Sequence, residues 1–267
     1  MVYFKFVRLQ TYLQKMITMK KLSSFICLLL ILVISGVAQN KKINVLVFSK
    51  TSGFRHNSIS SGLKTLSDLA QERKWVLTAT ENAELFTPDF LKTFDVVVFL
   101  NPTLEVLNEQ QQKDFEAFMN TGKGFVGIHA AADCEYDWAW YGQLNGAFFR
   151  THPRGQTGTV IFENTDHPSM VPFKGMQTYR TFDEWYTFKE NPRAKVKVLA
   201  RLDETSLDVE TLKDDKWKMG DHPLIWYQEL GQTRSFYTVF GHTPEAFQDP
   251  KVKEHIGCAV DWVAKRN

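Results

Sequence analysis

Two short apolar runs, at 95–100 and 124–128, do most to limit what this chain can fold into. The first reads Asp-Val-Val-Val-Phe-Leu and the second Gly-Phe-Val-Gly-Ile. Apolar runs without polar alternation are typical of strands that are buried on both faces, as in a parallel sheet. Similar runs at 42–49 and 75–80 indicate two further strands ahead of them.

Helical patterns separate these strands. Apolar residues recur at helical spacing between 59 and 70, and Thr87-Pro88 supplies an N-cap followed by proline in the first turn. Another helix is expected over 108–120. Strand and helix therefore alternate, which predicts a parallel sheet with right-handed connections and helices packed on it.

The second half of the chain has a different pattern. Four more strands separated by turns are expected at 177–189, 194–202, 224–229 and 235–241, and Asp249-Pro250 begins a final helix. There is no internal repeat, no low-complexity linker and no clear domain boundary. We therefore expect one α/β domain over 39–267, a three-layer sandwich with a mainly parallel central sheet and an elaborated C-terminal half.

The first 38 residues stand apart from this domain. They contain five basic residues and no acidic one, then an apolar run at 25–33 and the small residues Gly36 and Ala38. This pattern is typical of a cleaved secretory signal peptide, so we expect export, to the periplasm of a bacterium, and no stable membrane span afterwards. Met16 and Met19 are alternative starts, and an uncleaved N-terminal anchor is the alternative interpretation.

The net charge of +2 comes from this leader. Without its five cations, 27 of the 32 basic residues remain against 30 acidic ones, a net charge of −3. No Lys/Arg-rich run remains to follow a phosphate backbone, which disfavours nucleic acid as a partner. A mildly acidic, aromatic-rich domain is better suited to an uncharged sugar. The sequence leaves open whether Cys134 and Cys258 pair and whether the chain forms a homo-oligomer.

Candidate site residues follow the predicted strands. Ligands of open parallel sheets bind beyond the carboxyl ends of the strands. The first strand leads into Arg55-His56, the third into Asn101, the fourth into His129 and Asp133, and the run 235–240 into His242. These side chains are therefore expected near one edge of the sheet.

Gly127-Ile128-His129-Ala130-Ala131 is the most specific of these segments. Small residues around one polar residue at a strand-to-helix turn suit a tight elbow, where neighbouring backbones approach closely. Hydrolases built this way carry Ser or Cys at the centre, whereas histidine suits acid–base work or metal ligation. A structural histidine that caps the next segment is the alternative.

Polar residues also gather among aromatics in the second half. The segments 148–153 and 181–186 supply His152 and an Asp-Glu pair, while His167 and His222 stand in predicted turns and His255 on the expected surface of the last helix. We expect the substrate to contact the polar and aromatic members of these segments and of the strand ends: Arg55, His56, Asn101, Asp133, His152, Asp183, Trp185 and Tyr186.

As a set, these motifs resemble the trehalose-utilisation, ThuA-like family. They are Phe54-Arg55-His56-Asn57-Ser58, Gly127-Ile128-His129-Ala130, Phe149-Arg150-Thr151-His152-Pro153, Asp183-Glu184-Trp185-Tyr186, and Arg234-Ser235-Phe236-Tyr237 with Gly241-His242. The resemblance covers 43–264 and implies a flavodoxin-like fold similar to class I glutamine amidotransferases. His129 stands where those enzymes have their nucleophilic cysteine, so glutaminase chemistry is not expected.

The family name implies a role in the catabolism of trehalose or a related disaccharide, and the resemblance implies 3-keto-glycosides as substrates. We therefore expect an enzyme that cleaves or isomerises an oxidised or ordinary disaccharide or glycoside, as a hydrolase, lyase or isomerase. A 3-keto group acidifies the hydrogen at C2, so a base can remove it and the glycosidic oxygen can leave by β-elimination, followed by hydration. We expect His129 or His242 as the base and Glu184 as the acid. A metal or Arg55 would polarise the ketone.

A divalent metal, with zinc as the expected ion, is a further prediction. Its candidate ligands are His56, His129, His152 and His242. No nucleotide cofactor is expected. The alternative to an enzyme is a carbohydrate-binding protein without catalysis, whose tryptophans Trp138, Trp140, Trp185 and Trp226 stack on sugar; core packing is the other interpretation of those side chains.

Overall fold

The computed structural model describes residues 42–265. The predicted signal peptide at 1–38 lies outside the described residues. From Ile43 onward the described chain forms one compact unit. Within it, every helix is too short or too polar to cross a bilayer.

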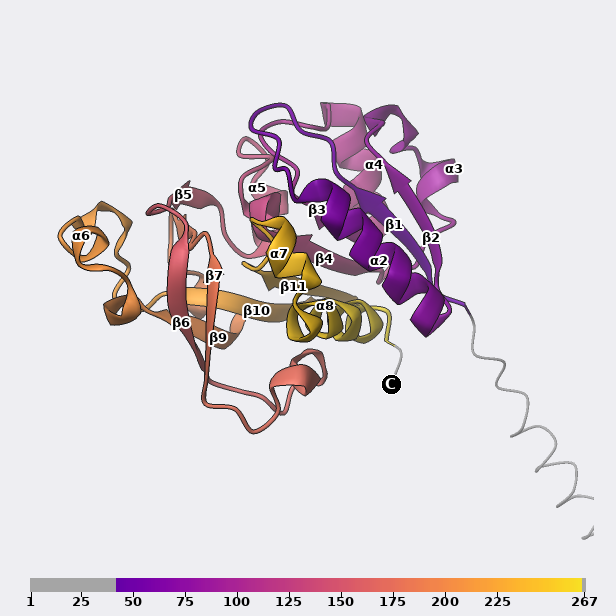
Figure 1. Cartoon of the computed structure of the whole chain (residues 1–267). Helices are drawn as coiled ribbons and strands as arrows, with labels where there is room; N and C mark the ends of the chain where they lie inside the picture. Colours follow the sequence, from indigo (N-terminus) through magenta and orange to yellow (C-terminus); the bar gives the residue numbers. More distant parts are fainter. Residues whose placement is uncertain (1–41, 266–267) are drawn as a thin grey trace, which may run out of the picture. The chain divides into compact units, whose positions relative to one another are not determined.

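Nine strands form the main sheet (Figure 1). They lie in the order β2 (Val76–Thr80), β1 (Asn44–Phe48), β3 (Val96–Leu100), β4 (Gly124–Ile128), β11 (Thr233–Thr238), β10 (Pro223–Leu230), β9 (Lys197–Asp203), β6 (Gln156–Phe162) and β7 (Thr178–Asp183). The strands from β2 to β11 are parallel neighbours; Gly127 of β4, for example, pairs with Phe99 of β3 and with Tyr237 of β11. Their carboxyl ends therefore meet at one edge.

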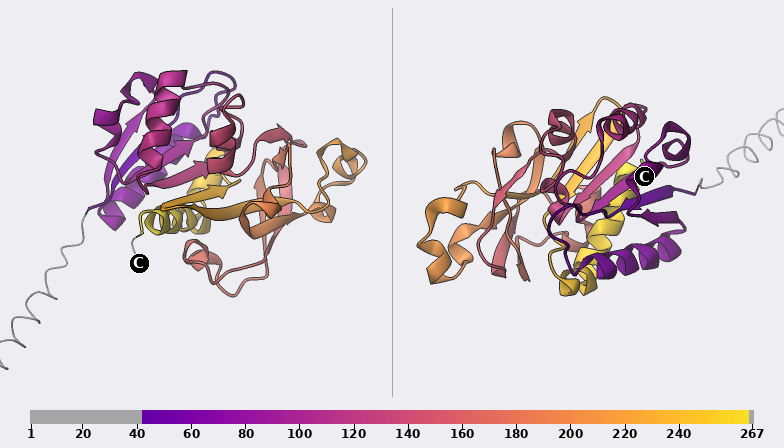
Figure 2. Two further views of the ribbon diagram at one scale, coloured as in Figure 1. Left: turned by 180° about the vertical axis from the view of Figure 1, so that it is seen from behind. Right: turned by 90° about the horizontal axis from the view of Figure 1, so that it is seen from above.

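Helices cover both faces of the parallel part (Figure 1 and Figure 2). Val96, Val98 and Leu100 of β3 share a core with α2 (Ile59–Arg73), α7 (Pro244–Gln248) and α8 (Pro250–Val263). Val97 and Phe99 point the other way, because successive strand residues alternate between faces. They pack with residues of α3 (Pro88–Leu91), α4 (Glu109–Met119) and α5 (Ala139–Asn145). The predicted α/β three-layer sandwich is confirmed.

The elaborated C-terminal half extends the sheet. β10, β9, β6 and β7 are joined by antiparallel pairing, and β5 (Phe149–Thr151) and β8 (Thr187–Phe188) form a separate antiparallel pair. Short helical segments complete the connections: α6 (Val209–Leu212), η1 (Ala83–Leu85), η2 (His129–Ala132), η3 (Pro168–Phe173), η4 (Pro192–Ala194), η5 (Glu204–Ser206) and η6 (Asp215–Trp217).

The run 177–189, which the sequence predicts as one strand, is interrupted after Asp183. The buried Asp183 carboxylate accepts hydrogen bonds from the amides of Glu184, Gly241 and His242, which turns the backbone away from the strand β6. Trp185 then enters the core and donates its indole N–H to the carbonyl of Gln156. This break places Glu184 at the sheet edge.

The structure also shows the burial of His255 and the state of the two cysteines of the domain. His255 is fully buried rather than exposed, because α8 packs against η3; its Nδ1 donates to the Ser169 carbonyl. The prediction of a surface residue was wrong. Cys134 and Cys258 are both free thiols. Cys134 lies buried beside Tyr141, whereas Cys258 lies on α8 beside Arg73, so they do not pair.

Candidate functional site

Four side chains from separate loops meet at the carboxyl edge of the sheet. His56 precedes α2, His129 follows β4, Glu184 follows β7, and His242 follows β11. One ligand atom from each lies within 4.8 Å of the other three, close enough for a single cation to contact all four. We call these four residues the His₃Glu cluster.

His129 occupies the predicted elbow. Its φ of 47° is in the left-handed region, which is uncommon for a residue with a side chain. Its Nδ1 lies 2.8 Å from the carbonyl of Val239 and must donate to it, since a carbonyl can only accept. The lone pair of Nε2 therefore faces the cluster, 3.6 Å from Oε2 of Glu184. Metal-ligating histidines are commonly oriented by a hydrogen bond of this kind.

The three imidazole rings of the cluster surround a common point. His56 lies 5.0 Å from His129 and 5.3 Å from His242, centroid to centroid, with the planes nearly perpendicular, and His129 lies 5.3 Å from His242. Each ring has a buried nitrogen without a hydrogen-bond partner: Nδ1 of His56, Nε2 of His129 and Nδ1 of His242. Buried polar atoms are rarely left unpaired, so three of them aimed at one place make the cluster a candidate cation site.

Charge in the cluster is concentrated on Glu184. Burial alone would raise the pKa of its carboxyl, but contacts with His129 and His242 hold that pKa well below its usual range. Glu184 is therefore a carboxylate, which suits cation binding and not the acid role expected from the sequence. Nδ1 of His242 lies 3.1 Å from Oε2 of Glu184, outside hydrogen-bond geometry.

The histidines differ in their protonation. Burial, reinforced by the neighbouring His129 and His242, lowers the pKa of His56 to about 3, so this ring is neutral and its nitrogen lone pair is available. Burial also lowers the pKa of His242, but the Glu184 carboxylate outweighs it and raises this pKa above the ordinary value. His56 therefore offers a free nitrogen lone pair, whereas His242 holds a proton more readily beside the Glu184 carboxylate.

Asn101 joins the three loops that carry the histidines. It is fully buried, with a left-handed φ of 51°. Its Nδ2 donates to Ser58 Oγ and to the Gly241 carbonyl, both at 3.0 Å, and its Oδ1 accepts from the Ala130 amide at 3.4 Å. Ser58, Ala130 and Gly241 are each next to or near a cluster histidine. Asn101 thus holds the three histidine loops together through its hydrogen bonds, and its own side chain does not line the pocket.

A pocket of about 200 Å³ opens onto the cluster. Besides His56, Glu184 and His242, it is lined by Phe54, Asp133, Phe149, His152 and Tyr186. The Tyr136 hydroxyl donates to Asp133, and burial raises the pKa of the Asp133 carboxyl. His152, expected as a metal ligand, instead places its Nδ1 3.0 Å from Oε1 of Glu184 and 2.9 Å from the Pro153 carbonyl. It therefore supports Glu184 from outside the cluster.

The sequence profile of the ThuA family, described as trehalose utilisation, matches residues 44–263. The match spans most of the chain. The chain belongs to the ThuA family. No curated protein matches the sequence.

Solved structures of other ThuA-like proteins share the fold. One from Bacteroides uniformis ATCC 8492 is 24% identical, with a TM-score of 0.70, over 84% of this chain and 92% of that one. Another from Parabacteroides merdae ATCC 43184 is 19% identical, with a TM-score of 0.67, over 84% of this chain and 90% of that one. The family resemblance noted in the sequence is confirmed.

The ThuA-family chain brings most, but not all, of the predicted site residues together. Asp133, His152 and Tyr186 line the pocket, while Asn101 and Asp183 lie buried beneath it. Arg55 points to Glu81 in an exposed ion pair at 2.6 Å and does not line the pocket. The four tryptophans that the carbohydrate-binding alternative would stack on sugar are also elsewhere: Trp185 and Trp226 are buried in the core, as the core-packing interpretation has it, and Trp138 and Trp140 pack near Phe115.

The aromatic walls of the pocket are Tyr186, which the sequence singled out, and Phe54 and Phe149, which it did not. Phe149 packs on Tyr186, centroid to centroid 4.2 Å, and Tyr186 lies 4.1 Å from His129. Phe54 stands at the mouth, edge-on to His56 at 4.8 Å. Both phenylalanines belong to the quoted family motifs, next to Arg55 and Arg150, and that proximity was the only signal for them.

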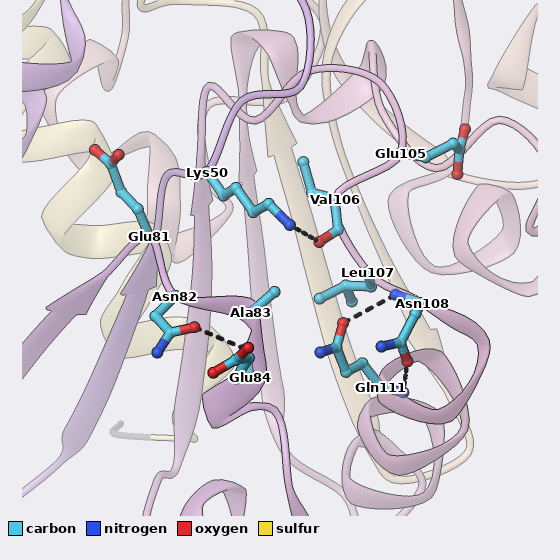
Figure 3. Close-up of a pocket in the computed structure, with 10 residues that line it drawn as sticks. All are labelled: Lys50, Glu81, Asn82, Ala83, Glu84, Glu105, Val106, Leu107, Asn108 and Gln111. Atoms are coloured by element: carbon cyan, nitrogen blue, oxygen red, sulfur yellow. Dashed lines mark hydrogen bonds between the residues drawn. The ribbon is translucent and has the colours of Figure 1, made fainter.

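A second hollow of about 500 Å³ lies where the loops after β1, β2 and β3 meet the start of α4 (Figure 3). Several of its polar side chains bond to backbone: Lys50 Nζ donates to the Val106 carbonyl, Asn82 accepts from the Glu84 amide, and Gln111 accepts from the Asn108 amide. Within residues 42–265, no set of three His, Cys, Asp or Glu side chains that could hold a metal ion lies in this hollow, in contrast to the His₃Glu cluster.

Proposed function

We propose that this ThuA-family protein is an exported, metal-dependent enzyme that cleaves a 3-keto-glycoside or 3-keto-disaccharide. The observation that carries the proposal is the meeting of three unpaired, buried imidazole nitrogens with one carboxylate at the base of a pocket. The family description, trehalose utilisation, supports a carbohydrate substrate. The export component rests on the N-terminal sequence, and the mass of the purified protein, with Gln39 expected as its first residue, would test it.

The cluster suits a divalent transition metal. Three imidazoles and one carboxylate match the nitrogen and oxygen ligands that zinc prefers, and related ions accept the same set. Bound between His56, His129, Glu184 and His242, such an ion would act as a Lewis acid toward the ketone of the substrate. The hydrogen bond from His129 to Val239 and the contact of His152 with Glu184 would then orient the ligands from behind.

Proton transfer falls to the pocket residues outside the cluster. The base removes the proton from C2. The electron pair of the broken C2–H bond then forms the C1–C2 double bond as the C1–O glycosidic bond breaks. The leaving oxygen takes a proton from the acid, and water then adds across the double bond, so that the net reaction is hydrolysis. Asp133 and His152 line the pocket and face this chemistry. The acid–base candidates from the sequence are arranged differently. Nε2 of His129 and Nδ1 of His242 face the Glu184 carboxylate.

The two acid–base candidates differ in environment. Burial raises the pKa of the Asp133 carboxyl, so this group takes up a proton more readily than a solvent-exposed carboxyl does, and it lines the pocket where the leaving oxygen would lie. One ring nitrogen of His152, Nδ1, is engaged with Glu184 and Pro153, which leaves Nε2 as the nitrogen available to accept a proton. We therefore assign Asp133 as the acid and His152 as the base.

Metal content and turnover test the proposal together. Untagged protein is analysed for metal, and Glu184→Gln, His129→Gln and His242→Gln are compared with His167→Gln, which removes an imidazole far from the cluster. We expect about one equivalent of metal in the wild type and in the control, and less in each cluster variant. Less than a tenth of an equivalent in the wild type contradicts the metal site.

Activity is measured on a panel of disaccharides, glycosides and their 3-keto derivatives. We expect turnover of one or more keto compounds and its loss in Asp133→Asn, whose metal content should stay at the wild-type level. Full activity in His129→Gln would contradict the proposed metal-dependent mechanism. Sugar binding without turnover by metal-loaded protein leaves the carbohydrate-binding alternative as the correct function.

A further inference from the structure

Two large apolar side chains are exposed next to the pocket. Phe54, at its mouth, is 66% exposed, and the adjacent Leu104 is 45% exposed. The pocket floor beside them is polar and ionisable. We call Phe54 and Leu104 the apolar lip.

The loop that carries Phe54 is held rigidly. The Ser52 amide donates to the Thr103 carbonyl at 2.9 Å, and the Ser52 hydroxyl donates to the Glu105 carbonyl at 2.7 Å. The Gly53 amide donates to Thr103 Oγ1, whose hydroxyl donates in turn to the Phe54 carbonyl at 2.9 Å. These bonds fix the backbone on both sides of Phe54, whose ring remains exposed although burial of its apolar surface would be favourable.

The backbone at Leu104 is also constrained, and it holds the Leu104 side chain at the surface. Its φ of 56° is left-handed, a conformation that large side chains rarely adopt and that only surrounding contacts can maintain. Its amide donates to the Asp133 carbonyl at 2.8 Å, which ties the lip to a pocket residue. Gly53 packs on it so closely that an added Cβ would lie 2.7 Å from Leu104 Cδ1. Contacts within the fold therefore fix the backbone of the apolar lip at the entrance of the site.

The pocket volume sets what the lip can contact. At about 200 Å³ the pocket is smaller than the roughly 300–1,000 Å³ typical of sites that enclose a drug-sized ligand. A pocket of this size would take one sugar ring, and a group attached to that ring would extend past Phe54, which lines the pocket, toward Leu104, which lies outside it.

We propose that the apolar lip is a subsite for the aglycone of a glycoside, and that it favours an apolar, aromatic aglycone over a second sugar. This inference rests on the proposed function, because it places a sugar ring in the pocket. An aromatic aglycone would stack against Phe54 in the offset or edge-on geometry that aromatic pairs prefer. It would also cover Leu104, removing its apolar surface from water.

Binding measurements test the lip without relying on turnover. Phenyl and methyl glucosides, in both anomeric forms, are titrated calorimetrically into the metal-loaded protein. We expect the phenyl compound to bind at least about tenfold more tightly than its methyl counterpart. Phe54→Ala should abolish this preference, bringing the affinities for the phenyl and methyl glucosides to within about twofold of each other. The matched control is Phe182→Ala, which removes an exposed phenylalanine that does not line the pocket.

The outcomes separate the two proposals. Equal affinity for phenyl and methyl glucosides in the wild type, or a preference that survives in Phe54→Ala, overturns the lip alone. Failure of every glucoside to bind overturns the lip, whereas the proposed function is judged separately, by turnover of the 3-keto derivatives. A dimer that Phe54→Ala converts to a monomer in light scattering would show that the lip is an interface between copies, and would also overturn it.

Discussion

Replacing Asn101 with alanine should weaken both the fold and the metal site. The Asn101 side chain makes hydrogen bonds to Ser58, Ala130 and Gly241, which lie on the three loops that carry the cluster histidines. No other single side chain among residues 42–265 bonds to all three of these loops. Its removal therefore frees the loops to move relative to one another.

The size of the effect follows from three contributions. Loss of two well-formed hydrogen bonds costs about 2 kcal/mol, and the buried Ala130 amide loses its acceptor at a further cost of about 1 kcal/mol. Alanine also tolerates the left-handed φ of 51° less well than asparagine, by about 1 kcal/mol. We expect the free energy of unfolding to fall by about 4 kcal/mol, and zinc affinity to fall at least about tenfold.

Two companion variants make the measurement specific. Asn101→Gly lacks the same hydrogen bonds but tolerates the left-handed backbone, so it should be about 1 kcal/mol more stable than Asn101→Ala. Leu69→Ala creates a cavity in the core under α2, at a comparable cost of about 2–5 kcal/mol, and should leave zinc affinity unchanged. Urea denaturation of the metal-free proteins and competitive zinc titration supply the two numbers.

Either of two results would contradict the prediction for Asn101→Ala. A loss of less than about 1 kcal/mol in Asn101→Ala would show that the three loops hold their positions without its side chain. An equal drop in zinc affinity in Leu69→Ala and Asn101→Ala would show that affinity follows global stability and not the position of the loops.

Two further predictions concern buried groups. Burial lowers the pKa of His255 from 6.5 to about 4, so the neutral ring stabilises the fold above pH 6.5 and this contribution, about 3 kcal/mol, is lost as pH falls toward 4. His255→Asn should show a correspondingly shallower pH dependence in urea denaturation, and an unchanged dependence contradicts this. A Cβ on Gly127 would lie 2.4 Å from Asn145 Oδ1, so Gly127→Ala should lower stability by about 1–3 kcal/mol, seen as a reduced melting temperature. An unaltered melting temperature would mean that Asn145 moves aside freely.

The strands of the parallel half could be predicted from local sequence. The runs at 95–100 and 124–128 became β3 and β4 because a strand buried on both faces has no polar position to interrupt it. The same logic placed His129 and His242 at strand ends, and parallel pairing brings those ends to one edge. Glu184 was recognised from its motif, but its ligand-like environment depends on the break that Asp183 makes after β7.

Side-chain exposure was much harder to predict. His255 was placed on the surface because its own helix leaves that choice open, and only the packing of η3 against α8 buries it. Trp185 resembled a stacking platform, yet it fills the space above Gly158, where an added Cβ would lie 2.8 Å from its ring. Arg55 is adjacent to His56 in sequence but pairs with Glu81, because neighbouring residues in a loop point in different directions.

By itself, the sequence determined the class of fold, the edge of the sheet at which the candidate site lies, and the supply of histidines there. These depend on hydrophobic pattern and on strand polarity, which are local properties. The tertiary structure decided that three imidazoles and one carboxylate face one another, that Asn101 and Asp183 support them, and that Phe54 stays exposed. Those outcomes depend on contacts between residues far apart in the chain, and no local pattern encodes them.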